Sequence, residues 1–194
     1  VDEENDNATS GIWEIGIPLA TFSDQGNQAQ AGMDHSEVGE QCFLTGASTQ
    51  NNNVGFDDVD GGRTTLLSPV FDFSDYSEVL ITYWRWYTND IGDNGNNDKW
   101  VVSVSDNGGE SWVDIENTSI SNASWVKQRF ILNDYISLTS NVVFRFVAED
   151  ILNTGDAGSG GSLIEAAVDD FRIETVSDNS GLYGDINSDQ SVDV

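Results

Sequence analysis

Histidine, cysteine and basic residues are scarce in this chain of 194 residues, and each scarcity excludes a class of function. The one histidine, His35, excludes a metal site built from several histidines. The one cysteine, Cys42, excludes an internal disulfide, and its apolar neighbours in QCFLTG favour a buried thiol. Seven Lys and Arg stand against 34 Asp and Glu, so we expect no binding to nucleic acid or to an anionic membrane surface.

Long apolar runs and catalytic motifs are missing as well. No apolar run approaches the roughly 18 residues that a membrane-spanning helix needs, so we expect no membrane insertion. No G-x-S-x-G motif accompanies His35, and among 34 acids a pair of carboxylates has no diagnostic value. We therefore expect no enzymatic activity. The chain begins at Val1 without a Met, which favours a processed or excised segment.

Acidic and aromatic residues are abundant. The formal net charge of −27 costs stability by self-repulsion unless cations bind, and calcium is the cation that carboxylate and carbonyl oxygens favour. Six Trp, nine Phe and five Tyr supply too much apolar surface for a disordered acidic chain. The sequence therefore predicts a folded protein that binds calcium.

Short apolar stretches separated by Gly, Asn and Asp clusters predict β-strands, and helical periodicity is nearly absent. About nine short strands with long polar loops favour an all-β fold, an antiparallel β-sandwich of the jelly-roll type. We expect it over residues 11–175, after an acidic segment (1–10) and before a linker (176–183). The predicted strands are 11–17, 41–45, 64–71, 78–88, 99–105, 112–116, 124–132, 142–148 and 163–174.

The segment YWRWY, residues 83–87, raises the question of which side chains face the core. Alternation along a strand places Trp84 and Trp86 on one face, and Tyr83, Arg85 and Tyr87 on the other. A lone buried cation is expensive, so we expect the tryptophans in the core and the arginine outside.

The strand 142–148 repeats this pattern, with Phe144 and Phe146 opposite Arg145. Aromatic faces stack on sugar rings, and Arg and Asp side chains bind hydroxyls. The face with the arginines is therefore a candidate glycan platform, with loop 89–98 as its rim. The alternative is that a loop covers this face and that Arg85 pairs internally, for instance with Glu165. The candidate ligand-binding residues are Tyr83, Arg85, Tyr87, Arg145 and Asp98.

The order of YWRWY and three further segments, one before it and two after it, carries a resemblance to a known class of module. TTLLSPVFDFS (64–74), VVFRFVAED (142–150) and EAAVDDFRI (165–173) resemble, in that order, MAM-like and carbohydrate-module-like jelly-roll accessory domains of secreted bacterial proteins. The resemblance covers residues 11–175. It implies a non-catalytic, extracellular module that is adhesive or binds glycans. MAM modules contain disulfides, which this chain lacks.

Two acidic segments are candidate calcium sites. GDINSDQSVDV (184–194) resembles the first half of a dockerin or EF-hand loop, because oxygen-bearing residues recur at every second position. It departs from that loop in having Gln190 where Gly is usual; the alternative is a plain acidic tail. Carboxylates in NVGFDDVDGG (53–62), together with the last strand, form the second candidate. The candidate metal ligands are Asp185, Asn187, Asp189, Ser191 and Asp193 in the first site, and Asp58, Asp60 and Asp169 in the second.

These features predict a calcium-stabilised interaction module, secreted or on the cell surface, that binds a glycan or cell-surface polymer. The alternative is a structural subunit that assembles head-to-tail with copies of itself into an extracellular fibre or surface layer. In that case the terminal segments would form the contacts, and a neighbouring copy would supply the carboxylate expected at the twelfth position of the calcium loop.

Overall fold

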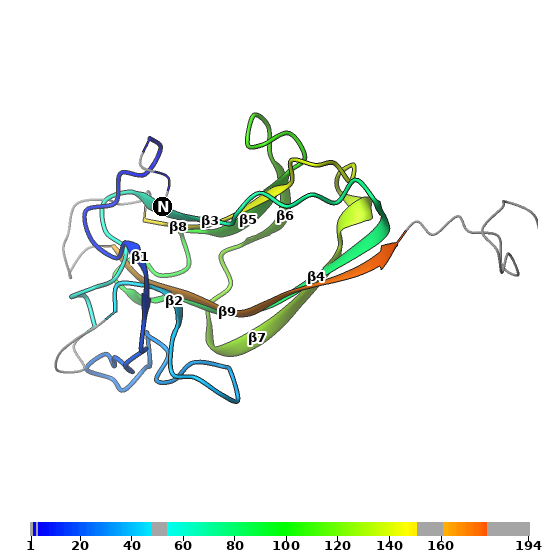
Figure 1. Cartoon of the computed structure of the whole chain (residues 1–194). Helices are drawn as coiled ribbons and strands as arrows, with labels where there is room; N and C mark the ends of the chain where they lie inside the picture. The colour runs from blue at the N-terminus through cyan, green and yellow to red at the C-terminus, as the bar shows by residue number, and fades with distance from the viewer. Residues whose placement is uncertain (1, 3, 48–53, 151–160, 178–194) are drawn as a thin grey trace, which may run out of the picture.

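A computed structural model describes residues 2, 4–47, 54–150 and 161–177. Two antiparallel sheets face each other in this part of the chain, so the predicted all-β sandwich with nine strands is confirmed (Figure 1). The five-stranded sheet has the order β1 (Trp13–Gly16), β2 (Cys42–Thr45), β9 (Ser162–Ser177), β4 (Tyr76–Gly92) and β7 (Asn122–Ile131). The four-stranded sheet has the order β3 (Arg63–Leu67), β8 (Val143–Glu149), β5 (Trp100–Ser105) and β6 (Val113–Thr118).

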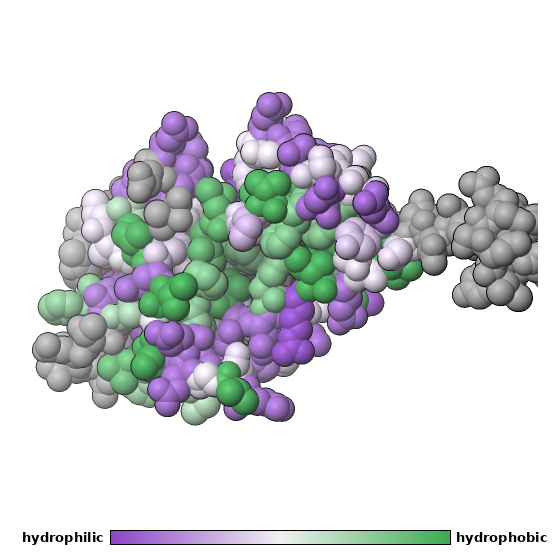
Figure 2. Space-filling model, in the orientation of Figure 1, coloured by the Kyte–Doolittle hydropathy of each residue, from purple (hydrophilic) through white to green (hydrophobic). Residues whose placement is uncertain are grey.

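The longest strands, β4 and β9, pair with each other from Tyr76↔Ser177 to Gly92↔Ser162 and form the centre of the larger sheet. A 3-10 turn, η1 (Leu132–Asp134), follows β7. In the described part of the chain, no helix has the length and apolar character to cross a membrane. Apolar side chains reach the surface between the sheets (Figure 2), where β2, β3, the segment after β3, β8 and β9 line a cavity of about 130 Å³.

The core lies between the two sheets and is rich in aromatic rings. Strand β8 follows the predicted alternation: Phe144 and Phe146 are buried, and Arg145 lies outside with its guanidinium carbon 4.4 Å from the ring centroid of Trp112. From β4, Tyr83 enters the same core and meets Phe146 edge-to-face at 5.3 Å.

The predicted orientation of YWRWY was wrong, because β4 turns the face that carries the tyrosines and Arg85 toward the other sheet. Tyr83 and Tyr87 are fully buried in the inter-sheet core, and Arg85 is 5% exposed. Trp84 and Trp86 lie on the outer face of the five-stranded sheet. The prediction assumed that a buried arginine would be alone.

Arg85 is not alone, because Glu116 on β6 forms a buried ion pair with it across the sandwich. The same carboxylate accepts hydrogen bonds from the Tyr83 hydroxyl at 2.6 Å and from Trp100 Nε1 at 2.9 Å. Internal pairing of Arg85 was the alternative that the sequence left open, and its partner is Glu116 in place of Glu165. A paired and hydrogen-bonded charge is tolerated in a core where a lone one is not.

Substituting Glu116→Gln is expected to lower the free energy of unfolding by about 3–5 kcal/mol, because Arg85 would remain buried without a counter-charge. Chemical denaturation measures this loss. Glu110→Gln, in the exposed β5–β6 turn, is the control and should change stability by less than about 0.5 kcal/mol. A Glu116→Gln loss as small as that of the control would contradict the role given to the ion pair.

Candidate functional site

The outer face of the five-stranded sheet carries polar and aromatic side chains in register. Trp84 on β4 lies opposite Lys127 on β7 and Asp169 on β9, and Thr82 lies opposite Arg172 on β9. Opposite positions of antiparallel strands place their side chains on the same face, about 5 Å apart. Trp84 is partly exposed, whereas Thr82 is buried.

A bulge in β9 brings two consecutive acids to this face. Between the pairs formed by Trp84 and Thr82, β4 has one residue while β9 has two, Asp170 and Phe171. Asp170 has a φ of 49°, in the left-handed region that an extra residue of this kind can adopt. Phe171 packs against the core, while Asp169 and Asp170 both contact the loop between β1 and β2.

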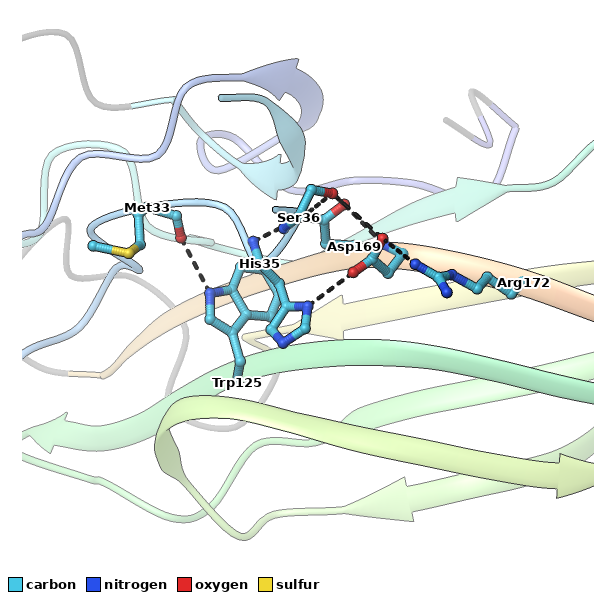
Figure 3. A network of polar contacts seen from close by, with 7 residues as sticks. Met33, His35, Ser36, Trp125, Asp169 and Arg172 are labelled. Atoms are coloured by element: carbon cyan, nitrogen blue, oxygen red, sulfur yellow. Dashed lines mark hydrogen bonds and ion pairs between the residues drawn. The ribbon is translucent and has the colours of Figure 1, made fainter. Parts of the chain in front are cut away.

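This β1–β2 loop, residues 17–41, crosses the outer face and is fastened to it by His35 and Ser36 (Figure 3). The backbone N–H groups of His35 and Ser36 donate to Asp169 Oδ2 at 2.8 and 3.2 Å. His35 Nδ1 lies 2.8 Å from Asp170 Oδ2, and its ring stacks on Trp84 with centroids 3.7 Å apart. The hydrogen bond from His35, and to a lesser extent Arg172, lowers the pKa of Asp170 below its usual value.

The first half of the loop explains why Trp86 is buried although it faces outward. The indole N–H of Trp86 donates to the carbonyl of Ala29, a loop residue, at 2.6 Å. The Trp86 ring packs with Cys42 and Leu44 in a second, smaller hydrophobic core. Cys42 is therefore buried, as predicted, and burial raises the pKa of its thiol to about 12. At the edge of the loop, Trp125 on β7 donates to the Met33 carbonyl at 3.1 Å (Figure 3).

Loop residues 35–38 and the outer face of the five-stranded sheet line an open cleft of about 450 Å³, which we call the Trp84 cleft. It presents the indole and imidazole rings beside two cations, carboxylates and hydroxyls. Such a mixture suits a polar ligand with apolar faces better than a purely apolar one. The lining residues are His35, Ser36, Glu37, Val38, Thr82, Trp84, Lys127, Asp170 and Arg172.

The structure does not assemble the platform that the sequence predicted. Tyr83, Arg85 and Tyr87 are interior, and Arg145 lies on the outer face of the other sheet. Asp98, a candidate ligand-binding residue at the end of the predicted rim loop 89–98, is 1% exposed. Because the faces of β4 are exchanged relative to the prediction, its three residues lie in the interior and share no surface with Arg145.

The second predicted calcium site is also divided. Asp169 binds the β1–β2 loop, whereas Ser10 Oγ donates to Asp60 Oδ2 at 3.2 Å, and Val59 N donates to the Ile164 carbonyl near the other end of β9. In the described ranges, no three His, Cys, Asp or Glu side chains form a group that could hold a metal ion. The first predicted site, with Asp185, Asn187, Asp189, Ser191 and Asp193, lies outside the described residues.

Neither a family model nor a curated protein sequence matches the chain at a significant score. Among solved structures, a family 61 carbohydrate-binding module in complex with β-1,4-galactotriose is 12% identical with a TM-score of 0.37, over 85% of this chain and 91% of that chain. The CBM22-1 xylan-binding domain from Paenibacillus barcinonensis is 13% identical with a TM-score of 0.36, over 88% and 90%. The enzymatically active domain of tailspike protein 4 from bacteriophage CBA120 is 8% identical with a TM-score of 0.48, over 89% and 19%. At these values the likenesses carry no argument about function.

Replacing Asp169 by Ala should loosen the loop segment that forms one wall of the Trp84 cleft. Hydrogen bonds to a charged group contribute about 1.5–3 kcal/mol, so the amides of His35 and Ser36 should exchange with solvent about 10- to 100-fold faster. Hydrogen-exchange mass spectrometry or NMR measures this. Asp134→Ala, an exposed acid in η1, is the control. Unchanged exchange at residues 35 and 36 would show that Asp169 does not hold the loop.

Proposed function

We propose that this protein is a non-catalytic carbohydrate-binding module and that the Trp84 cleft is its binding site. The observation that carries the proposal is the partly exposed indole of Trp84 in an open polar cleft, presented by a central strand of a rigid sheet. The C–H faces of a sugar ring stack on aromatic rings, and its hydroxyls need charged or polar partners around them.

The surroundings of Trp84 support this reading. The His35 ring stacks on the Trp84 indole at a plane angle of 19°, and both rings line the cleft. Lys127 and Arg172, on the strands either side of β4, supply donors, and Asp170, whose pKa is lowered chiefly by its hydrogen bond with His35, supplies an acceptor. The hydrogen bonds from residues 35 and 36 to Asp169 fix the loop before a ligand arrives, which reduces the entropy lost on binding.

The proposal includes an extracellular location, secreted or at the cell surface, for which the charge of −27 and the abundance of polar loops are the support. Its binding partner at that location would be a glycan or a cell-surface polymer. Head-to-tail assembly of copies is not part of the proposal, since the segment 184–194 on which that prediction depended lies outside the described residues.

Trp84→Ala should raise the dissociation constant for the bound polysaccharide at least about 10-fold, because it removes the stacking surface. A glycan array first identifies the ligand, and affinity electrophoresis or calorimetry then measures the variant. Trp112→Ala removes a partly exposed indole from the other sheet and is the matched control, expected to bind as the unmodified chain does.

Two results would overturn the proposal. One is an array on which the chain binds no glycan; the other is an equal loss of binding in Trp84→Ala and Trp112→Ala. Near-ultraviolet circular dichroism distinguishes lost contacts from lost folding in either variant.

A further inference from the structure

Basic residues are rare in this chain, yet three of the seven lie on one face of the fold. The outer face of the five-stranded sheet carries Lys127 and Arg129 on β7 and Arg172 on β9. All three side chains are exposed. On a surface with so many acids, a basic residue finds a carboxylate partner almost anywhere, so a group of basic residues around one cleft needs a reason. The other four lie on the second sheet, in the interior or in a loop: Arg63, Arg85, Lys99 and Arg145.

The three cations occupy two neighbouring rows across β7, β4 and β9. In one row Arg129 and Arg172 flank Thr82, and in the next row Lys127 lies opposite Trp84. Directly opposite residues are about 5 Å apart, and alternate residues of one strand are about 7 Å apart. Both arginines and the lysine are therefore within side-chain reach of a ligand whose ring lies on Trp84.

Two of these cations have no internal counter-charge. Within the described residues, ion pairs are formed by His35, Arg85 and Arg172, and neither Lys127 nor Arg129 takes part in one. Arg172 contacts Asp170 through Nη2 alone, at 3.3 Å, and its side chain is 69% exposed. A guanidinium group has five N–H donors, so Arg172 keeps donors for a ligand as well.

The acids near the cleft lie on the side of β9 and the loop, away from β7. Asp169 already accepts two backbone N–H groups of the loop, and Asp170 is bonded to His35 and Arg172 (Figure 3). Glu37, which also lines the cleft, belongs to the loop that Asp169 fastens to β9. The face is thus divided, and its β7 side offers cations that the protein does not neutralise.

This division favours an anionic ligand over a neutral one. A net charge of −27 repels an anionic polymer from most of the surface, so a face that binds one must supply cations locally. A neutral glycan needs only uncharged donors, and the chain has these in abundance as Asn, Ser and Thr. Three cations are too few for the row of phosphates along a nucleic acid, but they suit the charged sugars that a cleft of about 450 Å³ can hold.

We propose that the ligand of the Trp84 cleft is an acidic polysaccharide. A sugar ring stacks on Trp84, and its carboxylate or sulfate group is bound by Lys127 and Arg129 on β7, while Arg172 donates from β9. Guanidinium groups bind oxyanions through two parallel hydrogen bonds, and ammonium groups bind them as point charges. This inference rests on the proposed function of the cleft. Uronic acids and sulfate esters share the chemistry that these cations recognise.

The first test compares acidic polysaccharides with uncharged derivatives of the same polymers. Polygalacturonate and alginate are paired with their methyl esters, and carrageenan with its desulfated form, in affinity electrophoresis or calorimetry with the full chain. We expect at least one acidic polymer to bind, and its uncharged derivative to bind at least about 10-fold more weakly. The polymer pair that shows this difference distinguishes a carboxylate from a sulfate ligand. Binding should also weaken as salt rises from about 0.02 to about 0.2 M.

The second test removes single cations. Lys127→Met and Arg129→Gln should each weaken binding of the acidic polymer about 10-fold, because each removes a charge-assisted hydrogen bond, and each should reduce its salt dependence. Lys99→Met is the matched control: it removes an exposed lysine and the same single charge just before β5, and should bind as the unmodified chain does. Losses no larger than that of Lys99→Met would overturn the inference.

The outcomes separate this inference from the proposed function on which it rests. Binding of a neutral polysaccharide through Trp84, with no acidic polymer bound, would overturn the inference and leave the proposed function in place. Binding of no polysaccharide would overturn both, as would binding of acidic polymers that Trp84→Ala leaves unchanged. Poly-glutamate, an anionic polymer without sugar rings, is the last control. If it binds as tightly as the best acidic polysaccharide, the cleft recognises charge alone and the inference fails.

Discussion

The buried ion pair between Arg85 and Glu116 is the interaction on which the rest of this structure depends. It joins β4 of one sheet to β6 of the other, and two further donors, the Tyr83 hydroxyl and the Trp100 indole, converge on the same carboxylate. Because side chains alternate along a strand, an inward Arg85 requires an outward Trp84. The pair that stabilises the core therefore also places the central aromatic ring of the cleft on the surface.

The same pair shows why strands were easier to predict than their faces. The strand periodicity in 142–148 gave the correct inward side for Phe144 and Phe146, since Arg145 has a surface ring to lie on. In 83–87 both faces carry large aromatic residues, so the arginine alone decided the prediction. The partner that permits its burial, Glu116, is 31 residues away and comes from the other sheet, and a local pattern contains no information about it.

The candidate site combines segments that are remote in the sequence. His35 meets Asp169 across 134 residues, and the bulge that turns both Asp169 and Asp170 toward the loop has no marker in composition. A partial signal did exist on β7, where the exposed residues Lys127 and Arg129 alternate and mark an outward face. Asp58 and Asp150, which are both buried, lie near each other for a simpler reason: β3 pairs with β8 in the register Arg63↔Glu149, so whatever precedes one strand lies near whatever follows the other. Given that pairing, their proximity could be deduced; the absence of a donor to the Asp58 carboxylate could not.

The hydrogen-bond partners of each carboxylate indicate its role in this chain, which the large number of acidic residues does not. Asp169 accepts two backbone N–H groups and fixes a loop, and Asp170 is paired with His35 and Arg172, so both are satisfied within the protein. Asp58 is buried more deeply than either, and neither oxygen of its carboxylate accepts a hydrogen bond. A carboxylate that is charged and satisfied belongs to a framework or to a ligand's surroundings, whereas one that the fold buries and leaves without a donor must either keep a proton or share a cation.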